Sequence, residues 1–189
     1  ELEFKSKGKL KTIGSSAFAK NAIVNLVIPE GVTKVGSLVF SNCEKLTNVY
    51  LPSTLSSIST TTASPFYLCA NIEKITVPNY MVSTNCNPGV VFLNSKSKIK
   101  SVEFSDNITS ISSNAFVRFT ALTTIRIPDT VTKIEVNAFN GCSSLAGKII
   151  IPENVEFIET SAFSSCNISE IEFKSKGKLK TIESRAFAK

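Results

Sequence analysis

Phenylalanine recurs along this chain with a nearly constant spacing. Eight of them are separated by 22, 26, 26, 24, 23, 24 and 24 residues: Phe18, Phe40, Phe66, Phe92, Phe116, Phe139, Phe163 and Phe187. A steady period in the twenties is typical of a solenoid, in which each repeat forms one coil that stacks on the next. Because no coil could bury its apolar side chains alone, the pattern predicts one elongated stack of about eight coils over residues 1–189.

The other apolar positions predict how each coil is built. Pairs of aliphatic residues two positions apart indicate strands with one face inward, and a proline ends four of them: Val49/Leu51, Ile75/Val77, Ile125/Ile127 and Ile149/Ile151, followed by Pro52, Pro78, Pro128 and Pro152. A second pair three positions apart, such as Val131/Ile134, suits a tight turn or a 3₁₀ turn. We therefore expect one parallel β-sheet, with short turns or 3₁₀ segments on the opposite side.

The first twenty residues return almost unchanged as the last twenty. ELEFKSKGKLKTIGSSAFAK and EIEFKSKGKLKTIESRAFAK match at 17 of 20 positions, at an offset of 169 residues. The other coils resemble one another only at their anchor positions, whereas these two also match at surface positions. A recent block duplication, a polymer-forming array or an engineered cap would explain this match, and it suggests that the chain is an internal part of a longer array with a 169-residue period.

Two segments resemble the BspA-like leucine-rich repeat, whose pattern is roughly LxxIxIPxxVTxIgxxAFxxC. They are IRIPDTVTKIEVNAFNGCSSL, residues 125–145, and VIPEGVTKVGSLVFSNCEKLTNVYLP, residues 27–52. The match weakens over residues 53–95, where STTTASP is inserted and NYMVSTNCNPGV blurs the V-x-x-I pair. The resemblance implies a leucine-rich-repeat solenoid on the cell surface or in the extracellular space. It also implies a role in adhesion or binding to host and matrix proteins.

The composition argues against an enzyme. The chain has no histidine, which excludes a histidine-based triad or imidazole metal ligands, and it has no GxGxxG, P-loop or CxxC motif. Glu153, Glu156 and Glu159 surround one turn and are expected to be a solvated edge rather than acid/base groups. We therefore expect no cofactor and no metal. No stretch approaches the roughly 20 apolar residues of a membrane helix, so no membrane insertion is expected.

Four of the five cysteines share one position of the repeat. Cys43, Cys69, Cys142 and Cys166 each follow a phenylalanine by three residues, which predicts an inward column. Adjacent coils are close enough for a disulfide between Cys142 and Cys166. Stacked equivalents, however, point their Cβ atoms in parallel, which favours buried thiols. Cys86 is out of phase with the repeat and is expected to be exposed.

The formal net charge of +6 comes mostly from lysine, and lysines alternate with other residues at both ends. Alternate residues of an extended segment point to the same side, so each set of four lysines would form a ridge. The two sets are Lys5, Lys7, Lys9 and Lys11, and Lys174, Lys176, Lys178 and Lys180. Such a ridge could attract acidic glycans, or it could be an edge that keeps the protein soluble and blocks pairing. The lack of interleaved aromatic residues and the few arginines argue against specific nucleic-acid binding.

The outward residue of each strand is the other candidate for binding. In leucine-rich repeats this column lines the concave sheet, where ligands often bind; here it is Val27, Tyr50, Thr76, Glu103, Arg126 and Ile150, flanked by Glu3 and Glu172. Val27 and Tyr50 are expected to form a small apolar patch. Two N-x-S/T triplets at predicted turns, at Asn107 and Asn167, would carry glycans in a secreted eukaryotic protein.

Two function classes follow from these observations. The first is a structural repeat protein that stacks head to tail into a fibre, favoured by the match between the ends. The second is an adhesion module that binds ligands on its concave face, favoured by the family resemblance.

Overall fold

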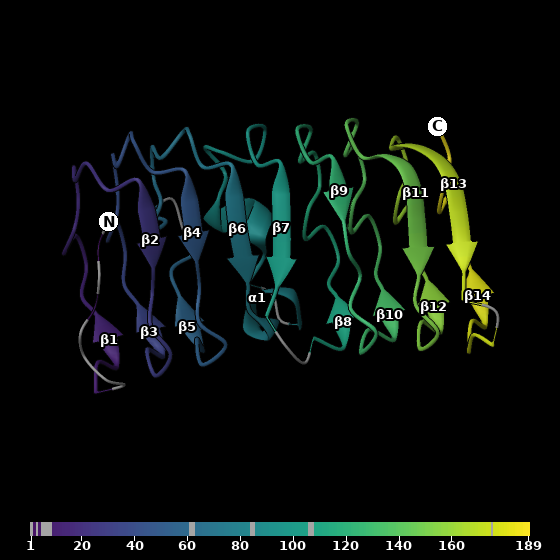
Figure 1. Ribbon diagram of the computed structural model, residues 1–189, viewed down its shortest axis with the longest axis horizontal. Coiled ribbons are helices and arrows are strands. Elements are labelled where there is room, and N and C mark those ends of the chain that lie inside the picture. The colour runs from purple at the N-terminus through teal and green to yellow at the C-terminus, as the bar shows by residue number, and fades with distance from the viewer. Residues whose placement is uncertain are drawn as a thin grey trace.

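The eight phenylalanine repeats form the coils of one elongated solenoid, numbered here as coils 1 to 8 by those phenylalanines. The computed structural model describes residues 2, 4, 9–60, 63–83, 86–105, 108–174 and 176–189. In Figure 1 the coils follow one another in chain order along the long axis, with the N-terminus at one end and the C-terminus at the other. The predicted solenoid of stacked parallel strands is confirmed.

The apolar pairs two positions apart form the main strands. They are β2 (Asn25–Val27), β4 (Asn48–Tyr50), β6 (Lys74–Val77), β7 (Ser101–Phe104), β9 (Thr124–Ile125), β11 (Ala146–Ile151) and β13 (Asn167–Phe173). Leu2 bridges to Leu26 ahead of them. All of these strands pair in parallel, with inward residues such as Val49 and Ile75 opposite each other and fully buried. Alternation along each strand therefore places one aliphatic column in the core and one column on the surface.

The pairs three positions apart do not end in the expected turns. Their second members lie in two-residue strands that form a second row, also parallel: β1 (Thr12–Ile13), β3 (Lys34–Val35), β5 (Ser57–Ile58), β8 (Ser110–Ile111), β10 (Lys133–Ile134), β12 (Phe157–Ile158) and β14 (Thr181–Ile182). Figure 1 shows this row of short arrows below the main strands. Pairing with the coils on either side extends the chain locally, which the spacing within a single repeat could not indicate.

The phenylalanines fill the third side of the coil and stack on one another. Phe116, Phe139 and Phe163 lie with ring centroids 5.2 and 5.1 Å apart and nearly parallel planes, as predicted. Stacking also joins Phe18 through Phe92, and Phe163 to Phe187. Phe116 instead meets Phe104 and Phe119 edge-on, so the column consists of two stacks of four rather than one of eight.

Two short helices replace the short strand in coil 4, which is why the column is interrupted there. They are α1 (Asn79–Ser83) and α2 (Pro88–Val91), and Asn87 caps the second by accepting a hydrogen bond from the Gly89 N–H. The first helix turns Met81 and Val82 into the core, and Cys86, in the segment between the two helices, is buried as well. The prediction that Cys86 is exposed was therefore wrong: its side chain is 4% exposed, because an irregular sequence here forms helical turns that still bury their apolar face.

All five cysteines are free and buried, and the four in phase point inward as predicted. Each in-phase thiol donates to the carbonyl of the preceding coil's phenylalanine, for example Cys142 Sγ to Phe116 O at 3.1 Å. Burial raises the pKa of Cys69 to about 12 and that of Cys86 to about 11, in each case partly offset by a hydrogen bond to the thiol. A hydrogen bond to Cys166, together with burial, raises the pKa of Cys142.

These thiols should be unreactive in the folded protein. At pH 8 a thiol-specific reagent should label the native chain at least 100-fold more slowly than the chain in denaturant, because all five thiols are buried and inaccessible to the reagent. Mass spectrometry of the labelled protein checks this residue by residue. A Cys142–Cys166 crosslink in the unreduced protein would contradict the prediction.

Candidate functional site

The main sheet is divided between β9 and β11, and one inserted residue accounts for it. The inward residue of the strand follows the column cysteine by six positions at Cys69–Ile75 but by seven at Cys142–Ile149. In regular coils the residue two positions before the inward isoleucine donates its backbone N–H to the previous coil. The Glu73 N–H, two positions before Ile75, donates in this way to Thr47 O. In coil 7 the donor to Thr123 O is Ala146, which lies one residue earlier.

The insertion shifts the start of β11 by one residue, and β11 pairs with β13 but not with β9 in the described part of the chain. Further along the strand, Ile149 and Ile151 keep the same inward alternation as Ile125 and Ile127. Gly147, with φ of +74°, takes up the extra residue in the left-handed region, which favours glycine. Within the described residues the main sheet consequently consists of a five-stranded part, β2-β4-β6-β7-β9, and a two-stranded part, β11-β13.

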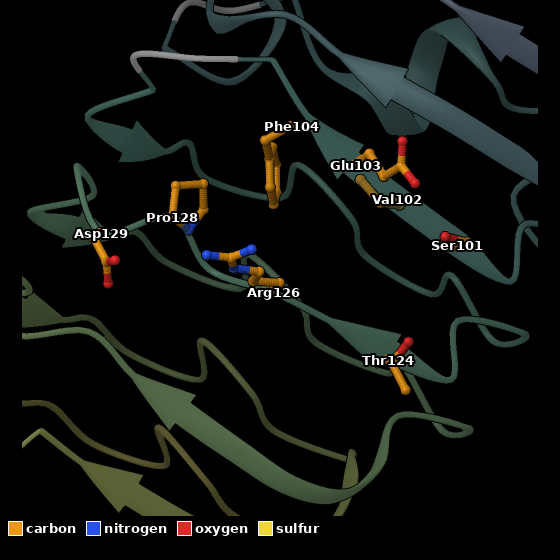
Figure 2. Close-up of a pocket in the computed structure, with 8 residues that line it drawn as sticks. All are labelled: Ser101, Val102, Glu103, Phe104, Thr124, Arg126, Pro128 and Asp129. Carbon is orange, nitrogen blue, oxygen red and sulfur yellow. The ribbon is translucent and has the colours of Figure 1, made fainter.

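A groove opens on the outer face beside this division. It has a volume of about 600 Å³ and is lined by β7 and by the chain around β9, including Glu103, Phe104, Arg126 and Asp129. In Figure 2 the Arg126 side chain lies in the middle, with Phe104 and Pro128 on one side and Thr124 on the other. A second hollow of about 340 Å³ continues toward β11 and shares Arg126 and Asp129 with the first. Arg126 therefore stands where the two hollows meet.

Most cations around the groove are already paired with carboxylates. Lys74 Nζ lies 2.6 Å from Glu103, and Lys174 Nζ lies 3.3 Å from Asp129. Lys148 is shared by Glu170 and Glu172 at 2.8 and 2.7 Å. Hydrogen bonding to Glu103 raises the pKa of Lys74, and the hydrogen bond from Lys148 lowers the pKa of Glu172. Arg126 is exposed and has no ion pair or side-chain hydrogen bond to any residue that the structure describes.

The predicted outward column lies on this face. Val27, Tyr50, Thr76 and Glu103 are consecutive partners across β2, β4, β6 and β7. Val27 is exposed beside a half-buried Tyr50, and Lys74 Nζ lies 5.7 Å from the centre of the Tyr50 ring. Ile150, opposite Glu172, is exposed and lines the second hollow. Only Glu103, Arg126 and Ile150 contribute to the grooves, whereas Glu3 lies outside the described residues.

The lysines of the predicted ridge that the structure describes are exposed, but several have partners in earlier coils. Lys5 and Lys7 lie outside the described residues. Lys174 pairs with Asp129, and Lys178 donates to Asn154 Oδ1 at 3.1 Å. Lys180 pairs with Glu156 at 2.7 Å and lies over the Phe157 ring. Lys9, Lys11 and Lys176 are exposed. The C-terminal lysines therefore also tie coil 8 to the coils before it.

Two of the three carboxylates that surround one turn, Glu156 and Glu159, have separate roles between coils. Glu156 pairs with Lys180, and Glu159 pairs with Lys133 at 2.8 Å while accepting from the Val136 N–H. The equivalents of Glu159 in neighbouring coils do the same: Glu135 accepts from Ser113, and Glu183 accepts from Thr160. These carboxylates therefore cap exposed donors of the preceding coil. In the described part of the chain, no three Cys, Asp or Glu side chains are grouped to hold a metal ion.

Of the two glycosylation triplets, only one can be placed. Asn107 lies outside the described residues. Asn167 is exposed but begins β13 instead of lying in the predicted turn, because its N–H pairs with Leu145 O across the sheet. Among the described residues no helix is long and apolar enough to cross a membrane.

Comparisons with known proteins agree with this architecture. The family described as BspA type leucine rich repeat region matches residues 11–146 and 63–189, with six copies. No curated protein matches the chain. A leucine-rich repeat protein from Bacteroides ovatus is 22% identical with a TM-score of 0.52, over 96% of this chain and 62% of that one. A leucine rich cell surface protein from Faecalibacterium prausnitzii is 23% identical with a TM-score of 0.50, over 93% and 55%. The chain thus spans less than two thirds of these solved structures, and the likeness shows the fold.

Proposed function

We propose that this chain, which belongs to the BspA-type leucine-rich repeat family, is a non-enzymatic structural module of the cell surface. In this proposal the solenoid continues head to tail in a longer array of 169-residue blocks. The surface location is supported by the family and by the cell-surface description of the Faecalibacterium protein. The arrangement into an array is supported by the outer face of coil 8.

The outer face of coil 8 has nearly the same sequence as a face that coil 2 covers. Ile13 in coil 1 is 4% exposed because coil 2 packs on it, whereas its equivalent Ile182 in coil 8 is 46% exposed. Phe18 stacks on Phe40 at 5.5 Å, and the equivalent Phe187 has a ring neighbour, Phe163, on its other side. Since 17 of 20 residues match, a coil like residues 21–43 is the natural cover for coil 8. The near-identity of the two coils in sequence is the observation that carries the proposal.

The backbone on the phenylalanine side supports the head-to-tail direction. Ser16 and Phe18 donate their N–H groups to Ser37 O and Val39 O of the next coil, and later coils repeat the pattern. In coil 8 the equivalent N–H groups belong to Arg185 and Phe187, and they have no acceptor among the described residues. Coil 1 presents the complementary carbonyl groups of Ser15 and Ala17. Donors at one end and acceptors at the other favour an open head-to-tail contact over a head-to-head dimer.

Sedimentation velocity and electron microscopy at increasing concentration test this contact. The chain should associate into linear stacks, and Ile182→Lys should reduce the association constant at least tenfold by placing a charge in the contact. Val27→Lys is the matched control, because Val27 is 47% exposed but lies on the main sheet. A chain that stays monomeric at high concentration, or equal effects of the two substitutions, would contradict stacking between copies.

A tandem chain tests continuation within one polypeptide. A second copy of residues 21–189 placed after Lys189 should form one solenoid. The amides of Arg185 and Phe187 should then exchange hydrogen at least 100-fold more slowly than in the single chain, because they gain acceptors. If their exchange rates stay unchanged, the sequence equivalence does not encode a continuous array.

A second candidate function is ligand binding on the main sheet face, as in an adhesion module. The observation that favours it is the pair of adjoining hollows at the sheet division, with Arg126 exposed where they meet. Mapping of chemical-shift changes on the sheet face by candidate host glycans and proteins tests this function. Binding confined to other faces would exclude it.

A further inference from the structure

We propose that the groove at the division of the main sheet binds a carboxylated sugar unit of an acidic glycan, with the Arg126 guanidinium holding the carboxylate. The inference rests on the second candidate function, the use of the main sheet face for ligands, and assigns to it a site and a ligand class.

Arg126 is placed to receive an anion. It follows the last paired residue of β9, and the one-residue shift of β11 leaves the outer face open on its far side. It lines both hollows, so its guanidinium can be approached from either one. A guanidinium presents its N–H donors as a planar fork that matches the two oxygens of a carboxylate. Figure 2 shows the side chain among the other lining residues, between Pro128 and Thr124.

The surrounding charges limit the ligand to about one negative charge at this point. Lys74, Lys148 and Lys174 are each engaged by carboxylates. Glu103 and Asp129 lie in the groove wall and would repel a densely sulfated chain. Arg126 is thus the one cation of the two grooves without an ion pair in the described part of the chain. A single carboxylate neutralises it without opposing the neighbouring acids.

The rest of the lining suits a hydroxylated ring. Phe104 and Pro128 offer apolar surface beside Arg126, against which the C–H face of a sugar can pack. Glu103 and Asp129 can accept hydrogen bonds from sugar hydroxyls, and the hydroxyls of Ser101 and Thr124 can both donate and accept. An acidic peptide could satisfy Arg126 but would bring few donors for these acceptors. The combination of one cation, apolar walls and several acceptors therefore favours a uronic acid unit over a polyanion or a peptide.

The test uses the methyl glycoside of galacturonic acid, which carries one carboxylate, and its methyl ester, each titrated into the whole chain and followed by calorimetry and NMR. The free acid should bind, and the ester, which lacks the charge, should bind at least tenfold more weakly. Arg126→Gln should also weaken binding of the acid about tenfold or more, as expected for the loss of a charge-assisted hydrogen bond. Arg126→Lys should give an intermediate loss, because the charge remains while the fork is lost. Arg185→Gln, the same change in the exposed phenylalanine turn of coil 8, should have no effect.

The remaining outcomes overturn the proposal. The proposal fails if the free acid does not bind at millimolar concentration, or if Arg126→Gln binds the acid as tightly as the original chain does. It also fails if the methyl ester, or an aspartate-rich peptide at Arg126, binds as tightly as the free acid. Loss of binding on replacing Lys9, Lys11 and Lys176 with Gln would place the glycan on the lysine ridge instead. If the shifts fall on Val27 and Tyr50 and do not depend on Arg126, the inference fails while the sheet face remains a ligand surface.

Discussion

Phe139→Ala should lower the free energy of unfolding by about 3–5 kcal/mol, the range measured for buried phenylalanine truncations. The Phe139 side chain is fully buried, and its ring lies between those of Phe116 and Phe163. Its removal leaves a cavity that the two rings cannot fill, since backbone hydrogen bonds such as Phe139 N to Ala162 O hold the coils in place. Denaturant unfolding followed by circular dichroism measures the loss.

Phe157→Ala is the matched control, because it makes the same phenylalanine-to-alanine change outside the core. Phe157 lies in β12, is 37% exposed and contacts the Lys180 ammonium from outside the core. Its truncation should cost less than about 1 kcal/mol, as is usual for partly exposed positions. A similar cost for both substitutions would mean that the phenylalanine stack does not hold the coils together. Because solenoids can unfold in segments, the slope of the denaturant dependence should be compared as well.

Gly36→Ala should destabilise the chain by about 1–3 kcal/mol, the usual cost of forcing atoms into a packed site. A Cβ at Gly36 would lie 2.9 Å from the backbone N of Ser15 and 3.2 Å from the carbonyl carbon of Gly14. These are backbone atoms of coil 1, so relief requires the two coils to separate. Thermal and denaturant unfolding of the variant measure the effect.

Gly14→Ala is the matched control, because Gly14 occupies the equivalent position one coil earlier. A Cβ at Gly14 would meet nothing within 4 Å. This substitution should be neutral, or stabilising by up to about 1 kcal/mol through a less flexible unfolded chain. If the two substitutions cost the same, the close approach of coils 1 and 2 does not exist in solution.

The sequence predicted the features that each coil repeats. The phenylalanine spacing predicted the stack, and the aliphatic pairs predicted which side chains point inward. The fixed distance from phenylalanine to cysteine predicted the buried thiols. These features follow from local alternation and from the need of every coil to bury the same few positions against its neighbours.

Features that depend on how one coil meets the next needed the structure. The V-x-x-I pairs became short strands because both neighbouring coils offer hydrogen bonds to them. Cys86 was buried because the irregular segment around it folds into helices that complete the core. Neither outcome can be read from the spacing inside one repeat.

The candidate groove shows the same distinction most clearly. Arg126 belongs to an outward column that period two alone placed on the sheet face, and the extra residue before Ile149 is visible in the sequence. The division of the sheet and the groove beside it were decided only by the tertiary structure. The same is true of the ion pairs: Lys74, Lys148 and Lys174 find carboxylates, whereas Arg126 has no ion pair among the described residues. The alternation within a coil is local and therefore written in its sequence, whereas register and ion pairing arise between coils and depend on both partners at once.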